Sequence, residues 1–125
     1  MLFMFVIACS NSLIGEWNGS CHFTDDQDHK QIDIDVSVER DNGYVIEGKL
    51  NFIHWNADEE YDGTMQGDYT GKHVLMKTEF ENLENPYRLR IETERVGALL
   101  EGSCNIRSLE GINAAGLSGE ITLSR

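Results

Sequence analysis

Hydrophobic and polar residues alternate along most of the chain after Leu13, which is the pattern of half-buried β-strands. The clearest case runs from Ile32 to Glu39, where aliphatic residues alternate with acidic residues or serine. Seven further stretches show the same alternation less strictly: residues 14–23, 44–53, 61–69, 73–81, 87–94, 98–106 and 117–124. No segment carries the 3.6-residue period of an amphipathic helix. The pattern therefore predicts eight strands and no helix.

The connections between these stretches alternate between short and long. Tight turns containing a glycine follow the second, fourth and sixth strands, at Asp41-Asn42-Gly43, Thr70-Gly71 and Val96-Gly97. Asn-Gly is a strong signal for a two-residue hairpin turn. Longer links follow the other strands, at residues 24–30, 54–60, 82–86 and 108–116. In an antiparallel meander, we expect the short turns at one end, together with both termini, and the long links at the other.

Eight strands in a meander would leave two exposed sheet edges, which invite aggregation. Pairing the last strand with the first removes both edges, and a closed barrel of eight strands is filled by side chains or holds one small ligand. We therefore predict an all-β fold for residues 13–125, an eight-stranded antiparallel up-and-down β-barrel. A β-sandwich of the same strands is the alternative.

The first strand carries Gly15-Glu16-Trp17. This tripeptide resembles the G-x-W motif of the calycins, the group that includes lipocalins and avidins. The resemblance implies a small β-barrel in which Trp17 plugs the closed end, where the first strand begins. The polar and tryptophan pattern with which avidins bind biotin is not recognisable, so biotin is not implied.

Residues 1–8 are wholly apolar and precede Cys9. The run is too short to span a bilayer, which takes about 20 residues, but it has the length of a signal-peptide apolar region. Val6-Ile7-Ala8-Cys9 resembles the bacterial lipobox, in which the cysteine is lipidated and becomes the mature N-terminus. The resemblance implies that residues 1–12 are a signal and anchor segment, that Cys9 is lipidated, and that the protein is held in the bacterial cell envelope. No Lys or Arg precedes Lys30, and an N-terminal strand packed on the domain is the alternative.

Two further cysteines fall on predicted inward faces. Cys21 is four residues beyond Trp17 on the first strand and shares its face, because alternate residues of a strand do so. Cys104 lies on the inward face of the seventh strand. Cys21 and Cys104 are therefore a disulfide candidate, provided that their Cα atoms come within about 7 Å. Two buried reduced thiols are the alternative.

The chain has 22 acidic residues against 10 Lys and Arg, a formal net charge of -12. This balance argues against a nucleic-acid binder, which needs a basic face. It also argues against simple electrostatic docking on anionic lipid, so membrane contact is expected only through a lipid anchor. A basic protein partner suits the charge better. Many acidic residues fall in the first two long links, and we predict a binding rim there: Asp25, Asp26, Asp28, His29, His54, Trp55, Asp58, Glu59 and Glu60. Solvated acidic loops without a partner are the alternative.

The predicted interior is rich in large apolar residues, which favours a filled core over a cavity for a small apolar ligand. Within the second link, Asp58, Glu60 and Asp62 precede Gly63 and resemble the first half of a calcium loop. The twelfth position of that pattern is Tyr69 instead of Glu, so this is a weak calcium candidate. No other metal site and no cofactor are predicted.

Motifs for nucleophilic catalysis, phosphate binding, dinucleotide binding or zinc proteolysis are absent from the sequence. We therefore expect a non-catalytic envelope lipoprotein that acts as a binding module through its acidic rim. A carrier of a small apolar ligand and an uncharacterised enzyme are the alternatives.

Overall fold

The computed structural model of the chain describes residues 12–24, 30–53, 60–80, 86–109 and 116–125. These residues form eight strands: β1 (Gly15–Phe23), β2 (Gln31–Asp41), β3 (Val45–Ile53), β4 (Glu60–Thr70), β5 (His73–Phe80), β6 (Tyr87–Val96), β7 (Leu99–Ser108) and β8 (Leu117–Ser124). Within these ranges there is no helix long and apolar enough to cross a membrane.

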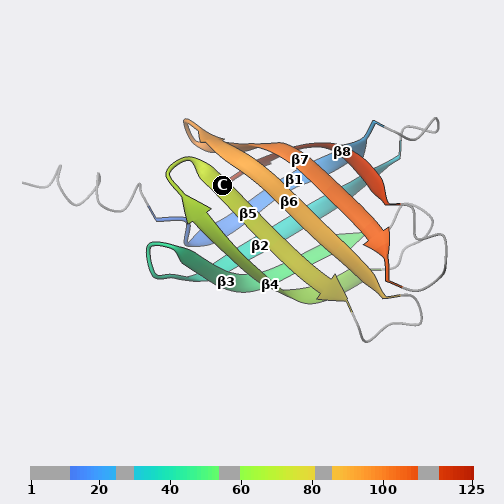
Figure 1. Cartoon of the computed structure of the whole chain (residues 1–125), viewed down its shortest axis with the longest axis horizontal. Coiled ribbons are helices and arrows are strands. Elements are labelled where there is room, and N and C mark those ends of the chain that lie inside the picture. Colours follow the sequence, from blue (N-terminus) through green and yellow to red (C-terminus); the bar gives the residue numbers. More distant parts are fainter. Residues whose placement is uncertain (1–11, 25–29, 54–59, 81–85, 110–115) are drawn as a thin grey trace, which may run out of the picture.

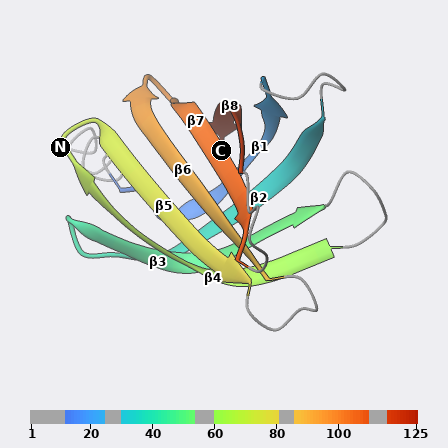
Figure 2. The same cartoon turned by 45° about the vertical axis from the view of Figure 1, so that its right-hand side comes forward.

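Every strand pairs antiparallel with its neighbours in sequence, and β1 also pairs with β8. The sheet therefore closes into an up-and-down barrel, as Figures 1 and 2 show. The predicted eight-stranded barrel is confirmed, and the β-sandwich alternative is wrong because no edge is left between β8 and β1.

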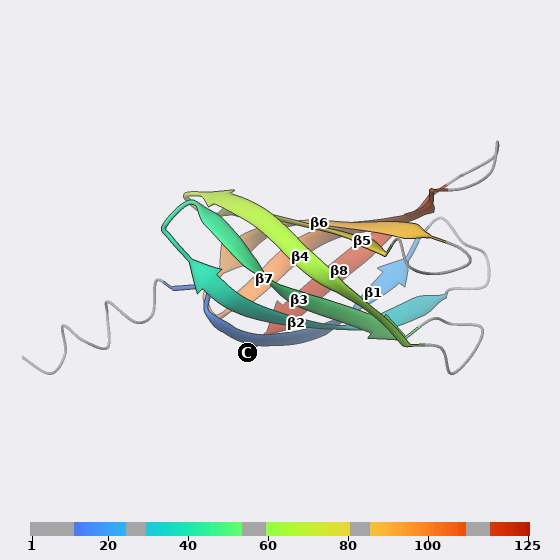
Figure 3. The same cartoon turned by 90° about the horizontal axis from the view of Figure 1, so that it is seen from below.

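The short turns and the strand ends that lead into the long links lie at opposite ends of the barrel (Figures 1 and 3). The three short turns lie at one end with the start of β1 and the end of β8. We call this the turn end, made of residues 12–15, 40–45, 70–73, 95–99 and 125. The strand ends that lead into the long links lie at the other end, which we call the loop end. The predicted separation is therefore confirmed for the strand ends, whereas most residues of the long links lie outside the described residues.

Two of the short turns have two residues, Gly71–Lys72 and Gly97–Ala98. Each begins with a glycine at positive φ, 60° and 62°. The β2–β3 connection, Asn42 to Tyr44, is one residue longer than its Asn-Gly signal predicts. The side-chain oxygen of Asn42 accepts hydrogen bonds from the amides of Tyr44 (3.0 Å) and Val45 (2.8 Å), which holds the wider turn.

Alternate residues of all eight strands point into the barrel and are buried. The core is Leu13, Trp17, Cys21, Phe23, Ile32, Ile34, Val36, Val38, Ile46, Leu50, Phe52, Tyr61, Met65, Val74, Met76, Phe80, Leu89, Ile91, Leu100, Cys104, Ile106, Ile121 and Leu123. Thr78 and Thr93 are buried with it. Both threonines occupy inward positions of the pleat, in line with Val74 and Met76 on β5 and with Leu89 and Ile91 on β6.

Glycines let neighbouring strands coil tightly where the barrel bends. A Cβ atom on Gly48 would overlap the carbonyl oxygen of Ser37 on β2, and one on Gly102 would overlap that of Glu92 on β6. Only glycine fits at such a close approach of two backbones. The in-strand glycines thus set the curvature that closes the sheet.

The turn end is plugged by Trp17, which is buried. Its indole Nε1 donates a hydrogen bond to the carbonyl of Leu13 (2.9 Å), and Leu13 is itself fully buried. The guanidinium carbon of Arg125 lies 4.4 Å from the centre of a Trp17 ring, a cation–π contact. Arg125 Nη1 also donates to the carbonyls of Ser12 (2.9 Å) and Ile14 (3.1 Å). The end of β8 therefore clamps the segment that enters β1.

Candidate functional site

The predicted binding rim lies almost entirely outside the described residues. Of its nine members, the structure describes Glu60 alone. Glu60 begins β4, is exposed, and accepts a hydrogen bond from Asn51 Nδ2 (3.3 Å). Cys9, the candidate lipidation site, also lies outside the described residues. The rim and the lipid anchor therefore stay predictions.

An acidic surface that the sequence reading missed covers the outside of β1 to β4. Residues paired across these four strands form three rows on the outer face. From the turn end to the loop end, the rows are Glu16-Ser37-Lys49-Thr64, Asn18-Asp35-Asn51-Asp62 and Ser20-Asp33-Ile53-Glu60. We call these twelve residues the acidic face, because they hold five carboxylates and one cation, Lys49.

The first two rows line a hollow of about 760 Å³ on the outer surface of the barrel. Three carboxylates border it, those of Glu16, Asp35 and Asp62, and the side-chain amides of Asn18 and Asn51 lie between them. These groups accept hydrogen bonds from, and attract, the guanidinium or ammonium group of a basic side chain. The hollow is therefore suited to cationic groups on a partner.

The alternation that predicts β2 already contained part of this surface. Asp33 and Asp35 occupy the polar positions of that strand, on the face opposite the aliphatic residues. The missing information was the pairing register of the strands, which determines which polar residues of β1 to β4 lie side by side. A run of acidic residues in a loop is visible in sequence, whereas acidic residues spread over four strands are not.

The outer surface of β5 to β7 has a balanced charge. Its cations are Lys77, Arg88, Arg90 and Arg107, and its carboxylates are Glu79, Glu92, Glu94 and Glu101. Two of the arginines are paired: Arg88 Nη2 lies 2.7 Å from Glu79 Oε1, and Arg90 Nη2 lies 2.6 Å from Glu92 Oε1. A second hollow over β4 to β7 is nevertheless bordered by four carboxylates, those of Asp68, Glu92, Glu94 and Glu101. The described barrel thus has two acidic areas, and the acidic face is the one that leads to the predicted rim through Glu60.

The interior gives the ligand-carrier alternative no support. Near the loop end, an aromatic cluster occupies the barrel, with ring centres 4.9 Å apart for Phe52 and Tyr61 and 5.0 Å apart for Phe52 and Phe80. The ring of Tyr87 stacks on Tyr61 at 5.6 Å. The space that a side chain on Gly63 would take is filled by Thr78 and Phe80 of β5. The described core is thus packed with side chains where a ligand would enter.

Two of the three calcium candidates, Glu60 and Asp62, are exposed residues of β4, and Asp58 lies outside the described residues. A strand holds successive outward side chains in line and does not wrap them around an ion as a calcium loop does. Among the residues with described positions, no group of three His, Cys, Asp or Glu side chains could hold a metal.

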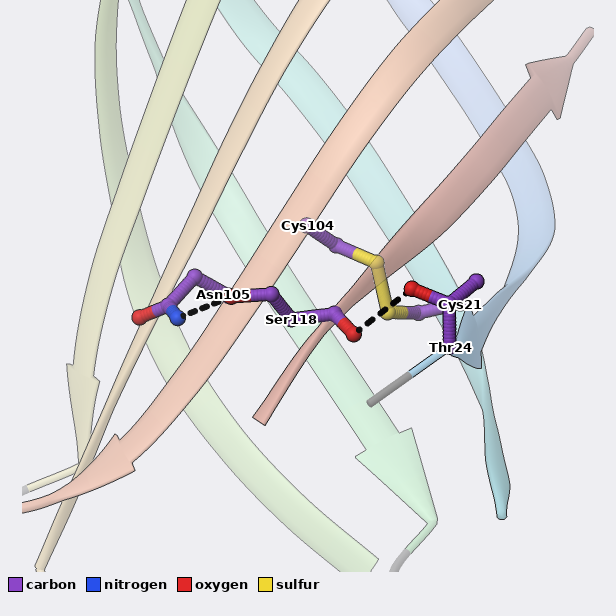
Figure 4. Close-up of a disulfide and its surroundings, with 5 residues drawn as sticks. All are labelled: Cys21, Thr24, Cys104, Asn105 and Ser118. Carbon is purple, nitrogen blue, oxygen red and sulfur yellow. Dashed lines mark hydrogen bonds between the residues drawn. A yellow bond between two sulfur atoms is a disulfide. The ribbon is translucent and has the colours of Figure 1, made fainter. Parts of the chain in front are cut away.

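Cys21 and Cys104 form a disulfide inside the barrel, with their Cα atoms 6.2 Å apart (Figure 4). The bond joins β1 to β7 across β8, where Ile121 pairs with Cys21 and Gly119 pairs with Cys104. Gly119 has no side chain to stand in the way on the inward face. The predicted disulfide is confirmed, and the alternative of two reduced thiols is wrong for this structure.

The pKa of Asp41 is shifted at the turn end. Partial burial by itself raises the pKa of Asp41, but three hydrogen bonds and the charge of Arg95 outweigh it, so the net pKa is lowered. The donors are the amides of Leu13 (2.9 Å) and Gly43 (2.9 Å) and the hydroxyl of Tyr69 (2.7 Å). The same hydroxyl bond, followed by burial, raises the pKa of Tyr69. These shifts come from contacts that fix the chain at the turn end.

We expect Asp41→Asn to destabilise the protein by about 1–3 kcal/mol near neutral pH, because an amide replaces an ionised acceptor of three hydrogen bonds. An ionised carboxylate with a lowered pKa stabilises the fold above its unfolded-state pKa, and this stabilisation is lost as the pH falls through the folded-state pKa. The difference in free energy of unfolding between wild type and variant should therefore shrink below pH 3.8, the ordinary pKa of an aspartate.

Urea unfolding at a series of pH values measures this difference. Asp68→Asn is the matched control, since Asp68 is an exposed carboxylate of β4 near the turn end. Its effect should stay within about 0.5 kcal/mol at every pH. A wild-type advantage over Asp41→Asn that persists unchanged in acid would contradict the assignment.

No protein-family model, curated protein or solved structure matches the chain. The calycin and lipobox resemblances therefore rest on their own residues. Trp17 does lie buried at the turn end, but a buried tryptophan at a barrel end does not identify a family.

Proposed function

We propose that this protein is a non-catalytic binding module of the bacterial cell envelope, tethered through a lipidated Cys9, which binds a basic protein partner on its acidic face and the adjacent acidic rim. The observation that carries the proposal is the acidic face, which holds five carboxylates and one lysine. Three of these carboxylates, those of Glu16, Asp35 and Asp62, line its hollow together with Lys49. The filled interior supports it further, because binding is then left to the outer surface.

The row of the acidic face nearest the loop end combines charge with an apolar contact. Ile53 pairs with Asp33 on one side and with Glu60 on the other, and half of its surface is exposed. An apolar side chain bordered by carboxylates can pack against the stem of a partner's lysine or arginine while the acids meet the charged head. Trp55, two positions further along the chain, belongs to the predicted rim. The proposed binding surface thus runs from the hollow toward the loop end.

The test is binding to a panel of basic proteins, such as lysozyme, cytochrome c and ribonuclease A, measured by calorimetry at low and high salt. We expect at least one member to bind, and Asp35→Asn/Asp62→Asn to weaken that binding roughly tenfold, because both carboxylates border the hollow. Added salt should weaken it as well, because the attracting charges are exposed.

The matched control is the double variant Glu94→Gln/Glu101→Gln. These two carboxylates border a second hollow, of about 490 Å³, over β4 to β7. The control removes the same charge from the other side of the barrel, so it should change the affinity less than about twofold. The proposal is wrong if no member of the panel binds, or if both double variants weaken binding equally.

A further inference from the structure

Exposed apolar side chains gather at the turn end. Six large hydrophobic residues of the described chain are exposed, and four of them lie at this end. They are Ile14 (50% exposed), Tyr44 (74%), Val45 (44%) and Val96 (49%). The other two, Ile53 and Leu109, lie at the loop end. The turn end is therefore the most apolar part of the described outer surface.

The turns hold these side chains outward in fixed positions. Tyr44 and Val45 follow Asn42, whose side-chain oxygen accepts hydrogen bonds from both of their amides. The carbonyl of Tyr44 accepts a further hydrogen bond from the amide of Tyr69 (2.8 Å). Ile14 is held on the other side, since its carbonyl accepts a hydrogen bond from Arg125. Hydrogen bonds thus fix the backbone that presents Ile14, Tyr44 and Val45 to solvent at the turn end.

The charge of the turn end is opposite in sign to that of the whole chain. Four basic side chains lie within these ranges, Arg40, Lys72, Arg95 and Arg125, against one acidic side chain, Asp41. Two further carboxylates reach the turn end from β3 and β6, since Glu47 pairs with Arg40 and Glu94 pairs with His73. Asp41 is engaged by Leu13, Gly43 and Tyr69, whereas Arg40 makes one loose and exposed ion pair, at 3.6 Å from Glu47. The turn end is therefore a basic and apolar surface on an otherwise acidic protein.

We propose that the turn end is a membrane-docking surface, which rests on a bilayer that contains anionic lipid. Aromatic and aliphatic side chains enter the headgroup boundary, and neighbouring Lys and Arg side chains meet anionic headgroups. The loop end then points away from the lipid, and the acidic face lies along the side of the barrel, where it stays in solvent. The net charge of -12 argued against electrostatic docking of the protein as a whole, and the turn end is the local exception.

The tether of the proposed function, on which this inference rests, begins at the same end. Arg125 holds the carbonyl of Ser12 at the turn end. Cys9 lies three positions before Ser12 in the sequence, so the two are at most about 10 Å apart. A lipid on Cys9 would bring this end of the barrel within reach of the headgroups, whereas the loop end lies a full strand length further away.

Vesicle binding by the full chain with Cys9→Ser tests the surface without the lipid. Vesicles of phosphatidylcholine, with and without phosphatidylglycerol, are sedimented with the protein. We expect Tyr44→Ser/Val96→Ser to lower the partition coefficient roughly tenfold on anionic vesicles, since both side chains lose apolar area that the lipid would cover. Arg40→Gln/Lys72→Gln should lower it by a similar factor on anionic vesicles alone.

The control is Ile53→Ser/Leu109→Ser, which removes comparable apolar surface from the loop end and should change partition less than about twofold. Residues 1–8 are common to all these forms, so the differences report the barrel. The inference is overturned if the loop-end pair matters as much as the turn-end pair. It is also overturned if the turn-end substitutions change only the oligomeric state, measured by light scattering.

The proposed function fails by different observations. It is wrong if mass spectrometry of the full chain expressed in a bacterium shows an unmodified Cys9. It is also wrong if the acidic-face variants bind basic proteins as the wild type does. Neither outcome alters the vesicle measurement on the Cys9→Ser protein, and a negative vesicle result leaves lipidation and partner binding unaffected.

Discussion

Replacing both Cys21 and Cys104 by alanine should lower the free energy of unfolding by about 4–5 kcal/mol, the largest effect that we expect from removing any single bond. The two cysteines are 83 residues apart in sequence. A crosslink that closes so long a loop restricts the unfolded chain, and the chain-entropy treatment gives this magnitude. The loss is large against the 5–15 kcal/mol that stabilises a typical domain.

Urea unfolding of the double variant and the wild type measures the loss. The matched control is Cys9→Ser, which removes a cysteine that is not part of the disulfide and should leave the stability of the barrel unchanged. Both disulfide sulfurs lie on buried residues, so a reductant should act on the folded protein slowly. A loss below about 1 kcal/mol would show that the disulfide does not constrain the unfolded chain as the treatment requires.

Trp17→Ala should destabilise the barrel by about 3–5 kcal/mol. The substitution removes the largest buried side chain at the turn end and leaves a cavity beneath Arg125. It also deprives the buried carbonyl of Leu13 of its donor. Arg125 would lose the indole ring on which it packs. We therefore expect the amides of residues 12–15 to lose protection from hydrogen exchange before those of the strands do.

Trp17→Phe separates packing from hydrogen bonding, because it keeps most of the ring and loses the indole N–H. We expect it to cost about 1–3 kcal/mol, clearly less than Trp17→Ala. Arg125→Ala combined with Trp17→Ala should cost less than the sum of the two single variants, because the two side chains contact each other. Additive losses would contradict a stabilising contact between Arg125 and Trp17.

The alternation of residue types predicts the strands and makes Cys21 and Cys104 a disulfide candidate. A period of two identifies which side chains turn inward, and the lengths of the connections determine which strand ends lie together. With Trp17 facing inward, both cysteines fall on the inner face, and the closed barrel then brings their Cα atoms to 6.2 Å. Leu13 was missed because it precedes the first strand, and its burial depends on Trp17 and Asp41, which reach it from elsewhere in the chain.

The acidic face and the basic turn end were not predictable in the same way. Asp35 and Asp62 become neighbours of one hollow only because β3 lies between their strands and pairs with both. Arg40 lies at the end of β2 and Lys72 in the turn between β4 and β5, and the closed barrel brings both to the same end. The sequence shows where charged residues lie along the chain. Which of them share a surface depends on the strand register and on the closure of the barrel.

Closure of the barrel also determines when the protein can fold. Asn18 in β1 pairs with Ser124 in β8, about one hundred residues later in the chain. During synthesis, β1 has no partner on that side until the last strand has emerged. Contacts between such distant residues make folding slow and leave an unpaired edge exposed in the meantime. We therefore expect this chain to complete its fold only after its whole length is free, and to depend until then on whatever keeps nascent chains from aggregating.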